Sequence, residues 1–181
     1  MSSGPTFGPT ALATPANALT VIRLVIAPIL IVLLMVSGRS WLLLGLWFLV
    51  AATDLADGWV ARRQGTTTSG AFLDPLADKV LVLGALGALV FRSILPLLPV
   101  LLIAIREIAM SVYRSVVGRK GRSVPAKPLG KAKAWVQDAV VVLALVPGFG
   151  GPLPHAMLVV LLWLAVAITL VSGAQYWLAH R

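Results

Sequence analysis

The sequence predicts an all-α integral membrane protein in which six transmembrane helices surround a polar cavity on the cytoplasmic side. Of its 181 residues, 59% are hydrophobic and only 12% are charged, and the mean hydropathy is +0.97. A soluble domain carries about 45–50% apolar and about 25% charged residues, so this composition excludes a water-soluble globule. The sequence contains no cysteine, which excludes disulfide frameworks and thiolate metal sites.

Six apolar stretches account for the predicted helices, since a membrane-spanning helix needs about 20 predominantly apolar residues. The second stretch is expected to continue as a helix toward Arg62, and the fifth helix is expected to begin earlier, near residues 128–131. The stretches are residues 20–36, 41–53, 73–91, 94–117, 134–146 and 157–178. Residues 1–14 are rich in Ser, Gly, Pro and Thr and are expected to form a disordered tail before a single domain of residues 15–181.

The distribution of Lys and Arg predicts the orientation of these helices. Loops and ends on the side of the N-terminus carry nine basic residues, whereas the opposite loops carry only Arg39 and Arg92. The excess of basic residues marks the cytoplasmic side. We therefore expect a multi-pass protein of the cell (inner, cytoplasmic) membrane with both termini in the cytoplasm.

Four of the six acidic residues lie in one short segment, which runs from Asp54 to Asp78. Asp54 and Asp57 are three residues apart, and Asp74 and Asp78 are four apart, so each pair lies on one face of a helix. A short polar turn separates the pairs, and two antiparallel helices would bring all four carboxylates together near the cytoplasmic surface. Each carboxylate costs about 2.5–3.5 kcal/mol inside a membrane on insertion scales, and four together repel one another.

A divalent cation with a preference for oxygen ligands removes this repulsion. Magnesium and manganese suit carboxylates, and four carboxylates have the capacity for two ions about 4 Å apart. Gly58 and Ala61 continue the face of Asp54 and Asp57, where their small side chains either leave a groove beside the metals or allow close helix packing. Further along the chain, Gly84 and Gly87 are expected to be packing glycines.

The spacing of these residues resembles the signature of the CDP-alcohol phosphotransferase family. The matching pattern is Asp54-x2-Asp57-Gly58-x2-Ala61-Arg62-x7-Gly70-x3-Asp74-x3-Asp78. One difference is the spacer of seven residues before Gly70, where the family usually has eight. A second segment that is similar to the family is Pro15-Ala-Asn17-Ala-Leu-Thr20-x2-Arg23.

The resemblance implies a metal-dependent enzyme that transfers a phosphatidyl group from CDP-diacylglycerol to an alcohol and releases CMP. It implies that the four aspartates hold magnesium or manganese ions and that Asp78 is also the catalytic general base. It further implies a homodimer. The positions that the resemblance assigns to CDP-diacylglycerol are Asn17, Ala18, Leu19, Thr20, Gly58, Ala61, Arg62 and Thr67.

A third segment is Arg106-Glu107-x6-Arg114, followed by the basic residues 118–133. It resembles the phosphatidylglycerophosphate synthase branch and implies glycerol 3-phosphate as the acceptor. The cations implied for its phosphate are Arg106, Arg114, Lys127, Lys131 and Lys133. Two alternatives concern this segment. Arg106 can instead form an internal ion pair with Glu107, and the basic stretch can simply follow from its place in a cytoplasmic loop.

Three other functions compete with this hypothesis. A sibling enzyme would use inositol phosphate, serine or another alcohol, and the aspartate pattern does not separate these acceptors. An intramembrane prenyltransferase would normally present two separate Asp-rich motifs in a longer bundle. A cation transporter would spread its acids across the depth of the bilayer and show repeat symmetry, whereas these acids cluster at one membrane interface.

Overall fold

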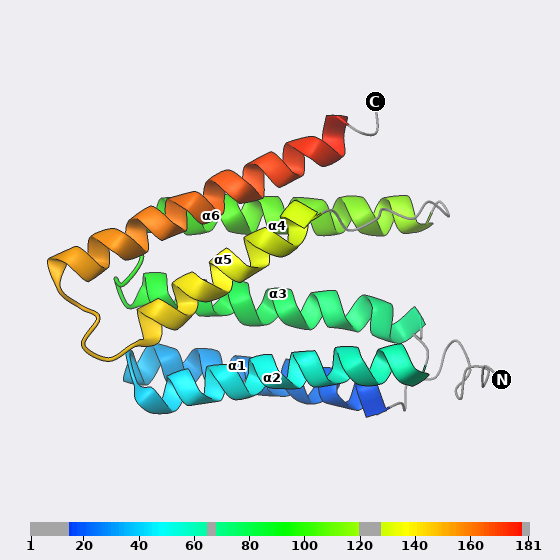
Figure 1. Cartoon of the computed structure of the whole chain (residues 1–181), viewed down its shortest axis with the longest axis horizontal. Helices are drawn as coiled ribbons and strands as arrows, with labels where there is room; N and C mark the ends of the chain where they lie inside the picture. The colour runs from blue at the N-terminus through cyan, green and yellow to red at the C-terminus, as the bar shows by residue number, and fades with distance from the viewer. Residues whose placement is uncertain (1–14, 65–67, 120–127, 179–181) are drawn as a thin grey trace. The chain divides into compact units, whose positions relative to one another are not determined.

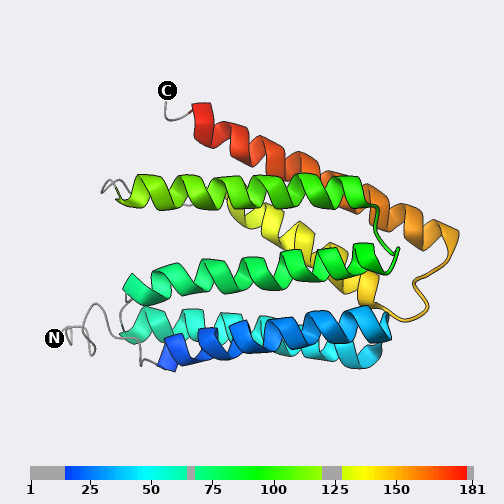
Figure 2. The ribbon, with the colours of Figure 1, turned by 180° about the vertical axis from the view of Figure 1, so that it is seen from behind.

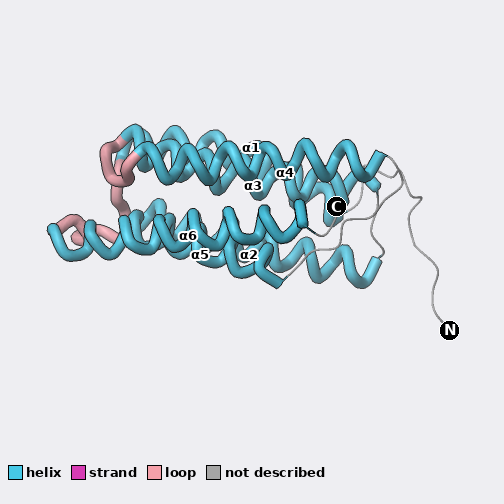
Figure 3. The backbone as a smooth tube through the Cα atoms, turned by 90° about the horizontal axis from the view of Figure 1, so that it is seen from above, coloured by secondary structure: helices cyan, strands magenta, loops and turns pink. Residues whose placement is uncertain are grey.

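The computed structural model describes the backbone of residues 15–64, 68–119 and 128–178, and the side chains of residues 21–53, 79–113 and 132–174. These residues form six helices and no strand (Figure 3). The helices are α1 (Pro15–Ser37), α2 (Trp41–Gln64), α3 (Thr68–Phe91), α4 (Leu97–Arg119), α5 (Pro128–Leu145) and α6 (Pro152–Leu178). The all-α prediction is confirmed, as are the extension of the second helix and the early start of the fifth. The predicted disordered tail, residues 1–14, lies outside the described residues.

The chain divides into two compact units, which we call the N-terminal unit (Met1–Ala88) and the C-terminal unit (Leu89–Arg181). In the N-terminal unit, α1 and α2 form an antiparallel hairpin (Figures 1 and 2). Gly38 ends α1 with a φ of 67°, and its N–H donates to the carbonyl of Leu34 at 3.0 Å. A glycine commonly occupies this left-handed position after a helix. Ser40 then accepts a hydrogen bond from the N–H of Leu42 at 3.2 Å, as a residue capping a helix start does.

The buried residues of this hairpin form layers. Their spacing of three and four residues places them on one face of each helix. Counted from the Gly38 turn, buried residues of the two helices lie at matching levels, since the helices are antiparallel. The layers are Leu34 with Leu43, Leu30 with Trp47, and Ala27 with Val50. Arg23 continues the buried face of α1 beyond the last of these layers and is only 2% exposed.

Helix α3 packs closely against α1 within the same unit. A Cβ atom added at Gly84 would collide with the side chain of Ile31, so only glycine fits there without a shift. This confirms the packing role predicted for Gly84. The same prediction for Gly87 is wrong, because nothing lies within 4 Å of a Cβ added there.

In the C-terminal unit, α6 packs against both α4 and α5. The buried apolar residues include Ile103, Val140, Leu145, Leu158 and Leu162. Among the described residues of this unit, four polar ones are also buried, and they come from all three helices. These are Glu107, Gln137, Thr169 and Ser172. The C-terminal unit therefore combines an apolar core with an internal polar layer.

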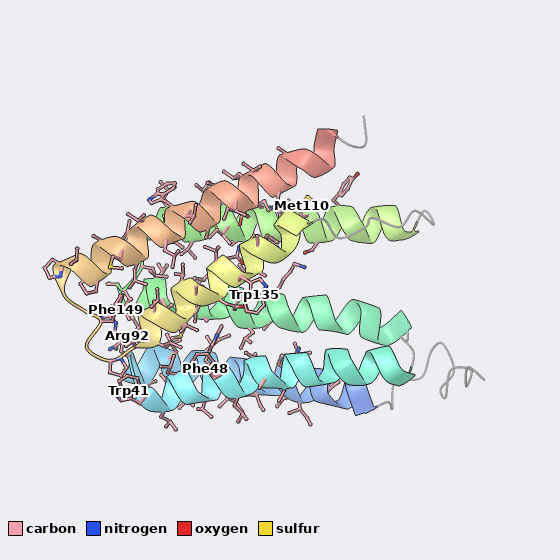
Figure 4. All side chains as sticks on the ribbon, in the orientation of Figure 1. Trp41, Phe48, Arg92, Met110, Trp135 and Phe149 are labelled. Atoms are coloured by element: carbon pink, nitrogen blue, oxygen red, sulfur yellow. The ribbon has the colours of Figure 1, made fainter. Side chains whose placement is uncertain are left out.

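The outward faces of the helices are largely apolar. Figure 4 labels Trp41, Phe48 and Trp135, whose exposed fractions are 67%, 54% and 70%. Among the described residues, the segment Pro152–Ala174 is the one helix that is long and apolar enough to cross a membrane, and α1, α2 and α3 contain shorter apolar stretches. A surface rich in large apolar side chains and a set of buried polar groups are both unusual in a soluble protein.

Candidate active site

The backbone places the four aspartate positions at two matched levels of α2 and α3. These helices run in opposite directions (Figure 1). Asp57 lies seven residues before the end of α2 and Asp74 six residues after the start of α3, which is about 10 Å of helix at a rise of about 1.5 Å per residue. Asp54 and Asp78 each lie ten residues from these ends, or about 15 Å.

The same positions continue the buried faces of their helices. On α2, residues 54, 57 and 61 extend the series of buried residues 43, 47 and 50 in steps of three and four. On α3, Asp74 and Asp78 precede the buried Leu81 and Ala85 by seven residues each. A set of carboxylates on two such faces suits a hard divalent cation. The four aspartate side chains lie outside the described residues, so the ligand set stays a prediction.

Of the residues predicted to bind CDP-diacylglycerol, those on α1 and α2 fall near the same end of the hairpin. Thr20 on α1 and Asp57 on α2 lie at the same level, because their separations from the Gly38 turn differ by a single residue. The side chains of all eight predicted contacts, residues 17–20, 58, 61, 62 and 67, lie outside the described residues. Their roles stay predictions.

A buried charged cluster joins α4, α5 and α6 in the C-terminal unit. Nη1 of Arg106 donates to Oε1 of Glu107 at 2.9 Å, and Nζ of Lys133 donates to the same oxygen. Nη2 of Arg106 donates to Oγ of Ser172 at 2.5 Å. The side chains of Arg106, Glu107 and Lys133 are 9%, 7% and 14% exposed. Because two cations share one carboxylate, these three side chains together carry a net positive charge.

The structure therefore brings together two of the five cations predicted for the acceptor phosphate, Arg106 and Lys133. The alternative of an Arg106–Glu107 ion pair is confirmed, and the same carboxylate also forms an ion pair with Lys133. The side chains of Arg114, Lys127 and Lys131 lie outside the described residues.

Two residues of this cluster were missed by the sequence analysis, Ser172 and Gly173. A Cβ added at Gly173 would lie 3.1 Å from Nε of Arg106, so glycine leaves room for the guanidinium. The available signal was a polar and a small residue side by side within the apolar α6. About one turn after Lys133 on α5 and one turn before Ser172 on α6, Nε2 of Gln137 donates to Oγ1 of Thr169 at 3.2 Å, which is an uncharged link between the same two helices.

Comparison with known proteins covers almost the whole chain. Residues 13–171 match the family described as CDP-alcohol phosphatidyltransferase. The chain is 37% identical over 180 residues to a Mycobacterium tuberculosis protein named "Probable phosphatidylglycerophosphate synthase", with 96% of this chain and 85% of that protein covered. Two proteins named CDP-diacylglycerol–glycerol-3-phosphate 3-phosphatidyltransferase are also similar. The Rickettsia bellii protein is 32% identical (91% and 94% covered), and the Bacillus subtilis protein is 41% identical (72% and 69% covered).

Proposed function

Because this chain belongs to the CDP-alcohol phosphatidyltransferase family, we propose that it transfers the phosphatidyl group of CDP-diacylglycerol to sn-glycerol 3-phosphate. The products are phosphatidylglycerophosphate and CMP, which places the enzyme in phospholipid biosynthesis. The observation that carries this proposal is the similarity along more than nine-tenths of the chain to proteins named for this reaction. The aspartate positions at matched levels of α2 and α3 support it independently.

The N-terminal unit provides the reacting groups of the donor side. Asp54, Asp57, Asp74 and Asp78 hold two magnesium or manganese ions, which when bound neutralise negative charge on the pyrophosphate and on the departing CMP. Asp78 takes the proton of the acceptor hydroxyl, whose oxygen forms a bond to the phosphatidyl phosphorus while the bond to CMP breaks. Arg62 binds phosphate oxygens of the nucleotide, as a guanidinium does with its paired donors.

The cations of the C-terminal unit bind the phosphate of the acceptor. Arg106 and Lys133 both donate to one carboxylate oxygen, and their two positive charges exceed its single negative charge. A phosphate therefore meets two donors that are already close together. Both side chains are largely removed from water, which strengthens their attraction for an anion. We propose that Arg114, Lys127 and Lys131 also bind this phosphate.

The exposed faces of the helices support a location in a lipid bilayer. Large apolar side chains cover the outside of α1 and α6, for example Val25 (61% exposed), Val36 (73%) and Val160 (69%). Water would make such a surface unfavourable, whereas lipid chains solvate it. We place the protein in the cell membrane as a multi-pass enzyme, with both termini in the cytoplasm and as a homodimer.

An acceptor assay tests the proposed function. Purified protein is given CDP-diacylglycerol with glycerol 3-phosphate, inositol phosphate or serine in parallel, and release of CMP is measured. We expect rapid release of CMP with glycerol 3-phosphate and not with inositol phosphate or serine. If CMP is released only with inositol phosphate, the proposed acceptor is wrong. If no CMP is released with any of the three alcohols, the proposed enzymatic function is contradicted.

A further inference from the structure

Glu107 occupies an unusual place in the buried charged cluster. Its side chain is only 7% exposed, and its Oε1 atom accepts hydrogen bonds from both Arg106 and Lys133. Two cations that bind the same oxygen atom lie close together, and they repel each other strongly in a poorly solvated environment. Glu107 offsets that repulsion and is also the shared partner that fixes where the two cations lie.

Ser172 holds the other end of the same guanidinium. Its hydroxyl accepts from Nη2 of Arg106, while Nη1 is bound to Glu107. Nε of Arg106 is buried and has no hydrogen-bond partner among the described residues. The guanidinium is thus fixed by α4 and α6 with donor capacity left over.

We propose that Glu107 is the positioning residue of the acceptor-phosphate site: it holds Arg106 and Lys133 together so that the phosphate of glycerol 3-phosphate meets a preassembled pair of cations. This inference rests on the proposed function. Preassembly increases affinity because the ordering of the two long side chains is already complete before the ligand arrives.

The direction in which Glu107→Gln changes the KM for glycerol 3-phosphate distinguishes this positioning role from a purely electrostatic effect. Glu107→Gln removes a negative charge beside an anion site, so charge alone would lower the KM for glycerol 3-phosphate. Loss of positioning raises it instead. We expect a rise of about tenfold in that KM, with the KM for CDP-diacylglycerol and kcat each changed less than about twofold. Glu107→Asp, which keeps the charge, should recover part of the affinity.

A matched control is available on α5 and α6. Gln137→Leu removes the uncharged link between these helices, so we expect it to lower the melting temperature in detergent without changing the KM for glycerol 3-phosphate. Ser172→Ala should raise that KM about twofold to threefold because it frees one end of the guanidinium. If Glu107→Gln leaves the KM unchanged, lowers it, or raises both KM values together, the positioning role is wrong. Failure of the wild-type protein to use glycerol 3-phosphate would instead contradict the proposed function.

A second inference concerns Arg23, and it depends on the layers of the α1–α2 hairpin. A guanidinium that is 2% exposed on an apolar face needs a compensating anion at the same depth. Arg23 and Asp54 lie almost equally far from the Gly38 turn, since Arg23 is one residue farther from the end of α1 than Asp54 is from the start of α2. The three apolar layers show the same offset of one residue, so Arg23 and Asp54 occupy the next layer.

We infer that Arg23 compensates the charge of Asp54 and keeps this predicted metal ligand in position before metal binds. The test needs neither substrate nor metal, so its outcome does not depend on the proposed function. Melting temperatures are measured in chelator for Arg23→Met, Asp54→Asn and the double variant. Removing one partner of a buried pair leaves the other charge uncompensated, whereas removing both does not.

We expect each single variant to melt lower than wild type and the double variant to melt no lower than either single one. Arg23→Lys, which keeps the charge, should stay close to wild type. Arg39 provides the control cation, because it lies in the α1–α2 connection, about 20 Å of helix from residue 54. Arg39→Gln and Asp54→Asn should therefore have additive effects. Additive effects of Arg23→Met and Asp54→Asn would show that the two residues are not paired.

Discussion

The two units of the chain carry opposite arrangements of charge. In the N-terminal unit, four carboxylate positions continue the buried faces of α2 and α3, and α1 contributes one buried cation, Arg23. In the C-terminal unit, cations from α4 and α5 surround one buried carboxylate, Glu107. Among the side chains that the structure describes, two cations thus meet one carboxylate in the C-terminal unit, whereas the four acidic positions of the N-terminal unit are accompanied by the buried Arg23. The difference suits two ligands of opposite sign, a metal cation and an acceptor phosphate, and it predicts that substitutions in the two units have different kinetic consequences.

The largest effect is expected from a substitution among the four aspartates of the N-terminal unit. Asp78→Asn removes the proposed base, so we expect kcat to fall about 10²–10⁴-fold. The melting temperature in detergent should remain near that of wild type. Asp138→Asn changes a carboxylate of the C-terminal unit that has no role in the proposed reaction, and it should retain most of the activity. Release of CMP by Asp78→Asn at a rate near wild type would exclude this residue as the base.

A smaller effect is expected when the buried charged cluster of the C-terminal unit loses one of its two cations. Lys133→Met leaves Arg106 on the carboxylate of Glu107 and removes a donor to the phosphate. We expect the KM for glycerol 3-phosphate to rise about tenfold, while the KM for CDP-diacylglycerol stays within about twofold. Arg92→Gln, on the connection after α3, should change neither constant. An equal rise in both constants for Lys133→Met would mean that the two units do not divide the substrates between them.

The smallest effect is expected from a substitution that disturbs the packing of α3 against α1 in the N-terminal unit. Gly84→Ala pushes a methyl group against Cδ1 of Ile31, and because this atom is the end of a flexible side chain, the cost lies at the low end of the about 1–3 kcal/mol typical of overpacking. The melting temperature should fall by about 2–4 °C for each kcal/mol lost. Gly87→Ala, three residues further along α3, has open space and should melt at or slightly above the wild-type temperature. If the two variants melt alike, the close approach of α3 to α1 is not what Gly84 provides.

The sequence was sufficient to predict the helices because the signals are local. Apolar stretches, the Ser37-Gly38 break and Pro128 each mark a helix or its boundary within a few residues. The aspartate pattern was equally readable, since spacings of three and four define a face of one helix.

The contacts of the buried charged cluster were less predictable. Arg106 and Glu107 are neighbours, so their pairing could be considered from sequence alone, but Lys133 and Ser172 lie 26 and 66 residues from their partners. Such contacts depend on how α4, α5 and α6 pack, and no local pattern encodes that packing. The layer shared by Arg23 and Asp54 was missed for the same reason, because it emerges only when two helices are aligned at their common turn.

The most direct test of the central claim is product formation by the purified protein with and without a divalent metal. CDP-diacylglycerol and glycerol 3-phosphate are supplied after chelation, and phosphatidylglycerophosphate and CMP are quantified before and after magnesium or manganese is added back. We expect no product in chelator and equal amounts of both products once metal is restored. Equal rates with and without metal would contradict the proposed role of the four aspartates, and CMP without phosphatidylglycerophosphate would contradict transfer to glycerol 3-phosphate.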